Sequence, residues 1–111
     1  MDAKRSEVEY RVEIFSGDTP PDGEALNRQM RAEGYDVFEW TDRPGAIYEP
    51  HAHSEDQSHC VVSGELELTV DGFGTVVLSA GDRDFMPAGT RHSARVLGDQ
   101  AVRYLIGVRY K

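Results

Sequence analysis

The chain begins with a strand-like pattern, because apolar and charged residues alternate from Val8 to Phe15. A period of two is typical of a half-buried β-strand. The predicted apolar face carries Val8, Tyr10, Val12 and Ile14.

The next segment, "SGDTPPDGEALNRQMRAEGY", has the pattern of a short helix. Thr19 is a candidate N-cap, the two prolines after it suit a first helical turn, and the acid at position 22 suits a capping box. Leu26 and Met30 share one face and are expected to pack on the body of the protein. Gly34 is the expected C-terminal stop.

After Gly34 the pattern changes to short apolar runs separated by turns such as "DRPG", "DGFG" and "PAG". Many short strands at this spacing are typical of a β-sandwich or barrel. The predicted strands are Tyr35–Trp40, Ala46–His53, Cys60–Ser63, Glu65–Val70, Thr75–Leu78, Asp84–Met86, His92–Leu97 and Ala101–Tyr110.

Composition narrows the class of protein. A length of 111 residues suits one domain with a single core. The net charge of −8 and the lack of a basic run argue against nucleic-acid binding. No apolar stretch is long enough to cross a membrane, and the charged N-terminus does not resemble a signal peptide. With a single cysteine, we expect a cytoplasmic protein.

Three of the four histidines lie in the stretch "HAHSEDQSH". On a continuous strand, His51 and His53 point to the same face and could chelate a divalent ion. This spacing alone is weak support, since two surface or hydrogen-bonded histidines would show the same pattern.

The residues around these histidines form two motifs. In the first, a glycine precedes His51 and His53, and Gln57 and a second glycine follow; in the second, glycine and "PAG" precede His92. Together with "VVSGELELTVDG" between them, the two motifs resemble those of the cupin family. The glycines of the pattern are Gly45, Gly64, Gly81 and Gly89.

The resemblance implies an all-β fold, a single small antiparallel jelly-roll β-barrel, with one short N-terminal helix. Residues 1–34 would form a strand and helix that pack on a barrel of residues 35–111. The resemblance also implies one divalent transition metal (Fe, Mn, Ni, Zn or Cu). Its ligands would be His51, His53, Gln57 and His92.

Two positions depart from the family pattern. Gln57 stands where a glutamate is expected, and Val96 where an asparagine is expected. A glutamine offers a metal only one neutral oxygen, so the ion would keep its full charge and favour an anionic or enolisable substrate. Glu55 or Asp56 could restore the charge, although an exposed acidic turn would look the same.

His59 lies two residues beyond Gln57 and is expected to face the same way. It is a candidate catalytic base, with direct metal ligation or a hydrogen bond behind the ligands as alternatives. Cys60 then faces away and is read as a buried structural thiol. Candidate pocket residues, each also explained by core packing, are Trp40, Tyr48, Phe85, Met86 and Tyr104.

Two functions remain open from the sequence. One is a small-molecule metalloenzyme of dioxygenase or isomerase type, and the other is a non-catalytic cupin that binds or senses a small molecule. The resemblance also suggests a homodimer that packs through the N-terminal strand.

Overall fold

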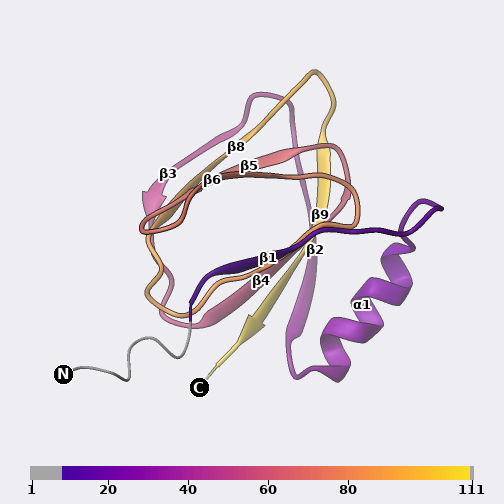
Figure 1. The fold of residues 1–111 in the computed structure, drawn as a ribbon, viewed down its shortest axis with the longest axis horizontal. Helices are drawn as coiled ribbons and strands as arrows, with labels where there is room; N and C mark the ends of the chain where they lie inside the picture. Colours follow the sequence, from indigo (N-terminus) through magenta and orange to yellow (C-terminus); the bar gives the residue numbers. More distant parts are fainter. Residues whose placement is uncertain (1–8, 111) are drawn as a thin grey trace.

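The computed structural model describes residues 9–110, which form two packed antiparallel sheets and one helix (Figure 1). The five-stranded sheet has the order β1-β7-β4-β9-β2, and the four-stranded sheet has the order β3-β8-β5-β6. This confirms the predicted all-β cupin-type sandwich with a short helix. The strands are β1 (Arg11–Glu13), β2 (Asp36–Asp42), β3 (Ile47–His51), β4 (Asp56–Ser63), β5 (Leu66–Val70), β6 (Gly74–Leu78), β7 (Arg83–Phe85), β8 (His92–Val96) and β9 (Val102–Arg109).

Two apolar clusters hold the layers together because the strands alternate their side chains. The main core lies between the sheets and includes Val61, Leu66, Leu68 and Tyr104. A smaller cluster lies under the helix on the other face of the five-stranded sheet and contains Met30, Tyr35, Val37, Cys60 and Leu105. The first cluster surrounds the inner end of the candidate site, so the site is built on the most rigid part of the fold.

The helix α1 (Gly23–Ala32) packs against β2 and β9 on the outside of the five-stranded sheet (Figure 1). Its N-cap is Asp22, whose carboxylate accepts the backbone N–H groups of Glu24 and Ala25. The prediction of Thr19 as N-cap was therefore wrong, because the prolines precede the helix instead of opening it. Gly34 ends the helix as predicted, with φ of 101°.

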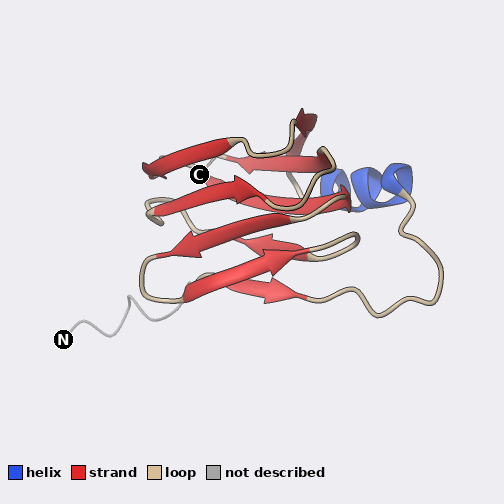
Figure 2. Ribbon diagram, turned by 90° about the horizontal axis from the view of Figure 1, so that it is seen from above, coloured by secondary structure: helices blue, strands red, loops and turns tan. Residues whose placement is uncertain are grey.

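Outside α1 the described chain is strand, turn and loop (Figure 2). Between residues 9 and 110 no helix is both long and apolar enough to span a membrane.

The N-terminal strand is shorter than the pattern predicted. β1 covers three residues and pairs with β7 at the edge of the sheet. Tyr10 and Val12 pack against the main core, but Ile14 is 66% exposed. Val8 lies outside the described residues.

The other predicted strands agree with the structure to within two residues at each end, apart from the start of β4, and two of the differences matter for the site. β3 ends at His51, not His53, and a bulge at Glu49–Pro50 shifts its register against β8. β4 starts at Asp56, not Cys60, because the polar residues Asp56 to His59 already pair with β9. Both differences fall at the candidate site.

Candidate metal centre

His51 and His92 meet because their strands pair directly. They are Cα partners in the ladder between β3 and β8, and their ring centroids lie 4.4 Å apart. The β-bulge before His51 turns its side chain into register with His92. Strand pairing alone therefore places two of the three imidazoles.

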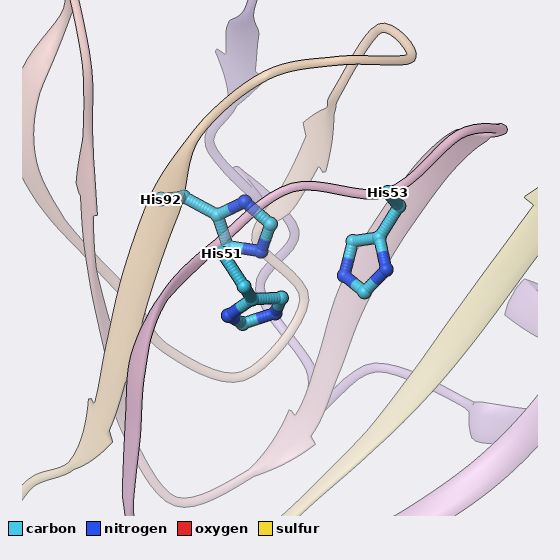
Figure 3. A group of neighbouring side chains, drawn as sticks. All are labelled: His51, His53 and His92. Atoms are coloured by element: carbon cyan, nitrogen blue, oxygen red, sulfur yellow. The ribbon is translucent and has the colours of Figure 1, made fainter.

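His53 reaches the same point from a loop. The sequence predicted that His53 would share a face with His51 on one strand. That prediction was wrong, because β3 ends at His51 and His53 lies beyond it. Its backbone carbonyl instead accepts the N–H of Gly89, at 2.7 Å, which ties this loop to the turn before His92. The three rings turn toward one another (Figure 3), and their ligand atoms all lie within 4.8 Å.

This spacing suits a single ion. Two nitrogens bound at about 2.1 Å to one tetrahedral ion lie about 3.4 Å apart, so the widest pair of ligand atoms would need to close by up to about 1.4 Å. Rotation of the histidine side chains would supply that movement.

Hydrogen bonds to backbone carbonyls set the tautomers of two rings. The Nδ1 of His51 lies 2.7 Å from the Glu49 carbonyl, and the Nδ1 of His92 lies 3.0 Å from the Thr90 carbonyl. A carbonyl can only accept, so each Nδ1 carries the proton and each Nε2 presents a lone pair. Burial lowers the pKa of His92, and the neighbouring histidines add to the effect. Burial also lowers the pKa of His53, with His51 as the next cause, so both rings favour the neutral form that binds metals.

Gln57 is buried in β4 and lines the same cavity as the three histidines. Its backbone exchanges two hydrogen bonds with Met86, which fixes where the side chain starts. The side-chain Nε2 donates to Glu55 Oε2 at 3.1 Å. The amide oxygen is then the atom that Gln57 has left to offer to an ion or a bound water.

The two acids considered as substitutes for the missing glutamate do not line the cavity. Glu55 holds the amide of Gln57, and Asp56 accepts the backbone N–H of Ala88 at 2.9 Å. Neither carboxylate joins the group of histidine ligand atoms.

His59 faces the cavity and is buried, with its ring 6.4 Å from that of His92. Its Nδ1 lies 2.9 Å and 3.1 Å from the two oxygens of Asp84, so Nδ1 carries a proton. Burial alone lowers the pKa of His59, but the charge and hydrogen bond of Asp84 outweigh it and raise the pKa above its ordinary value. His59 is therefore a more basic imidazole than His53 and His92.

Asp84 is itself fixed from three sides. It is fully buried and also accepts the backbone N–H of His59 and the hydroxyl of Tyr10. Sequence reasoning missed this residue, since an acid in a short predicted strand looks like a solvent-facing position. Only the pairing of β4 with β7 brings it under His59.

The cavity has a volume of about 220 Å³, which is small for a ligand site and suits a small metabolite. Trp40, Tyr48 and Tyr104 line it as expected, but Phe85 and Met86 do not and were wrongly grouped with the pocket residues. The described residues that line it are Trp40, Tyr48, His51, His53, Gln57, His59, Leu66, Leu68, His92, Ala94, Tyr104 and Ile106.

Cys60 is placed as predicted, and it and three other residues lie away from the cavity. Cys60 is fully buried in the cluster under the helix, and burial raises the pKa of its thiol to about 11. Arg91 and Arg95 are exposed, and Arg95 pairs with Glu67. Val96, which replaces the expected asparagine, is a core residue.

Similar structures support the fold. The DMSP lyase DddQ from Ruegeria pomeroyi is 25% identical, with a TM-score of 0.62 over 68% of this chain and 38% of that chain. An uncharacterized conserved protein with a double-stranded β-helix domain from Klebsiella pneumoniae is 26% identical, with a TM-score of 0.60 over 68% of this chain and 63% of that one. KdgF from Halomonas sp. is 22% identical, with a TM-score of 0.60 over the full chain and 87% of its own.

The chain thus spans well under half of the DMSP lyase that it matches. No curated protein matches the sequence. Residues 38–108 match the Cupin domain family, and this match covers more than half of the chain. With this match and its two-sheet sandwich, the chain belongs to the cupin family.

Proposed function

We propose that this cupin binds one divalent transition metal through His51, His53 and His92 and acts with it on a small anionic molecule. The convergence of three imidazoles, within 4.8 Å and at the wall of a cavity, carries the proposal. The donor set fits the metals expected for such a site, since imidazole suits iron, nickel, copper and zinc and also occurs with manganese.

The charge of the site supports an anionic ligand. The three imidazoles are neutral, and Gln57 could add only a neutral oxygen, so no ligand would offset the charge of a divalent ion. Bound there, the metal would act as a Lewis acid on an oxygen of the substrate. The carboxylate of a small metabolite would supply the missing negative charge.

His59 is the residue we propose as the base. Asp84 holds its Nδ1, so the free Nε2 is the atom available to the cavity. A proton on the carbon next to a carboxylate becomes more acidic when that carboxylate is polarised, and a nearby imidazole can accept it. This arrangement supports an isomerase-type reaction, with dioxygenase chemistry as the alternative if the metal is redox-active.

The first test is the metal content of protein purified without a polyhistidine tag or chelator. We expect about one transition metal per chain by mass spectrometry, and none in a His51→Ala/His92→Ala control. A wild-type protein that resists loading with iron, manganese, nickel, copper and zinc would exclude the metal site and favour a metal-free ligand-binding barrel.

The second test separates an enzyme from a binder. With a substrate in hand, His59→Asn should keep ligand affinity and abolish turnover, because asparagine fills a similar volume but accepts no proton. Unchanged turnover in that variant would remove His59 as the base. Retained metal with no turnover of any small anion would leave the non-catalytic role.

Two further expectations belong to this proposal. We propose a cytoplasmic location and a homodimer that packs through the N-terminal strand. Light scattering at micromolar concentration tests the dimer directly, and a monomer would contradict it.

A further inference from the structure

Three side chains that line the cavity share one hydrogen-bond acceptor, Asp42. The indole Nε1 of Trp40 donates to its Oδ1 at 3.1 Å, and the hydroxyl of Tyr48 donates to the same oxygen at 2.7 Å. The hydroxyl of Tyr104 donates to Oδ2 at 2.8 Å. We call Trp40, Tyr48 and Tyr104 the aromatic wall.

Asp42 is buried, with 9% of its surface exposed, and the three side chains that donate to it are neutral. Among residues 9–110, none of the ion pairs involves Asp42. Three hydrogen bonds offset much of the cost of burying a carboxylate but do not cancel its charge. The aromatic wall is therefore backed by an unbalanced negative charge.

The two phenols of the aromatic wall keep their protons. Burial raises the pKa of Tyr104, and the hydrogen bond to Asp42 raises it further. The same two causes raise the pKa of Tyr48. Each phenol thus remains a donor to the carboxylate.

No lysine or arginine lines the cavity, and the only basic side chains among the described lining residues are the four histidines. Next to the aromatic wall are the apolar side chains of Leu66, Leu68 and Ile106. A second carboxylate on a ligand, held against this wall, would meet the negative field of Asp42. The wall instead suits an organic cation, which aromatic rings attract by about 0.5–2 kcal/mol.

We infer that the cavity takes a small zwitterion whose cationic end, a fully substituted ammonium or similar onium group, lies against the aromatic wall. A cation without N–H groups fits best because aromatic rings offer it no hydrogen-bond acceptors. The anionic end would lie at the histidine triad, and this part rests on the proposed function. The cavity volume of about 220 Å³ limits the ligand to a small molecule.

The main experiment compares ligands that differ only in charge. Trimethylammonioacetate and 3,3-dimethylbutanoate have the same shape, since a quaternary carbon replaces the quaternary nitrogen. 3-(Trimethylammonio)propanoate and 4,4-dimethylpentanoate form a second pair with one more methylene. Calorimetry on the metal-loaded protein should show at least one zwitterion binding ten-fold or more tightly than its neutral-headed partner. Equal binding within both pairs, or no binding by either zwitterion, overturns the inference.

Asp42→Asn tests the source of the preference. It keeps the shape of the side chain but removes the charge, so the affinity ratio within a pair should fall toward one. Asp99→Asn is the matched control, because it makes the same substitution at an exposed position that does not line the cavity; the ratio should stay high. Circular dichroism checks that both variants fold, and the wild-type comparison stands even if Asp42→Asn does not.

A metal-free arm separates this inference from the proposed function. Trp40 is the only tryptophan in the chain, so intrinsic tryptophan fluorescence reports on the aromatic wall. Tetramethylammonium chloride, titrated into metal-free protein at constant ionic strength against sodium chloride, should change that fluorescence in a saturable way, and Asp42→Asn should abolish the change. If this response appears while no metal binds, the proposed function fails and the cation site stands. If metal binds and this response is absent, the cation site fails alone.

Discussion

Replacing Gln57 by glutamate tests what the neutral residue does at the site. In the metal-free protein, a carboxylate oxygen would replace the amide nitrogen that now lies 3.1 Å from Glu55. Two unit charges at 3.1 Å repel by about 5 kcal/mol at an effective dielectric constant of about 20. Glu55 is half-buried and can turn away or share a proton, so we expect a net loss of about 1–3 kcal/mol in the free energy of unfolding.

Metal should reverse the sign of this effect. The added carboxylate contributes a negative charge to a site of neutral donors, so Gln57→Glu is expected to bind a divalent ion at least about ten-fold more tightly. The metal-free variant should melt roughly 4–12 °C below the wild type, and its melting temperature should rise more on metal addition.

Thermal unfolding with and without a chelator, together with chelator competition for affinity, measures both effects. Glu55→Gln/Gln57→Glu is the control, because it removes the repulsion and should restore metal-free stability while it keeps the gain in affinity. If Gln57→Glu binds metal no better than the wild type, position 57 does not face the ion. If the metal-free stability of Gln57→Glu equals that of the wild type, the contact with Glu55 does not affect the free energy of unfolding.

Three further predictions concern stability and reactivity. Gly64 and Gly72 both have positive φ, of 85° and 82°. A Cβ at Gly64 would lie 2.6 Å from a backbone oxygen, whereas a Cβ at Gly72 would meet nothing within 4 Å. In chemical denaturation, Gly72→Ala should therefore lower the free energy of unfolding by about 1–2 kcal/mol, and Gly64→Ala should lower it by about 1–3 kcal/mol more. The hydrogen bond from Arg83 lowers the pKa of Glu33 below 4.5, so the ionised carboxylate stabilises the fold above that pH, and this stabilisation fades as the pH falls through the lowered pKa. Because the Glu33 side chain is 37% exposed, Glu33→Gln should lower the free energy of unfolding by about 1 kcal/mol or less at pH 7, and by still less at pH 3. The thiol of Cys60 is buried with a pKa of about 11, so iodoacetamide at pH 8 should label it only after unfolding, and rapid labelling of the native protein would contradict the packing under the helix.

The sequence was a good guide to the strands and turns because their patterns are local. Alternation and glycine-containing turns located each of the barrel strands, and the spacing of His51 and His92 in two motifs placed them in one site. The error at His53 concerns a strand boundary, since β3 ends at His51 and His53 lies in the loop that follows. A period of two cannot show where a strand stops.

What the sequence did not show depends on pairing between distant segments. Trp40 and Tyr104 are direct partners in the β2–β9 ladder, and Tyr48 joins them from the other sheet. These strand pairings make Asp42, which the sequence placed in a turn, the shared hydrogen-bond acceptor of the three aromatic side chains. Asp84 under His59 likewise depends on the packing of β7 beside β4. Tyr104 is 62 residues from Asp42 and Asp84 is 25 residues from His59, so no local pattern marks these two contacts.

The three carboxylates of this region follow one arrangement. Glu55 holds the amide of Gln57, Asp84 holds the imidazole of His59, and Asp42 holds the aromatic wall. None of the three lines the cavity, so each acts through the lining side chain that it fixes.

Among the described residues, the side chains that line the cavity are neutral unless a histidine is protonated. The three carboxylates lie behind these lining side chains. A ligand would therefore meet oriented donors and a directional field instead of a salt bridge. Discrimination then comes from where the ligand carries its own charges, with the anion toward the triad and the cation toward the aromatic wall. Gln57→Glu would break this arrangement by placing a charge in the lining itself, so the variant that binds metal more tightly should bind the carboxylate of a ligand more weakly.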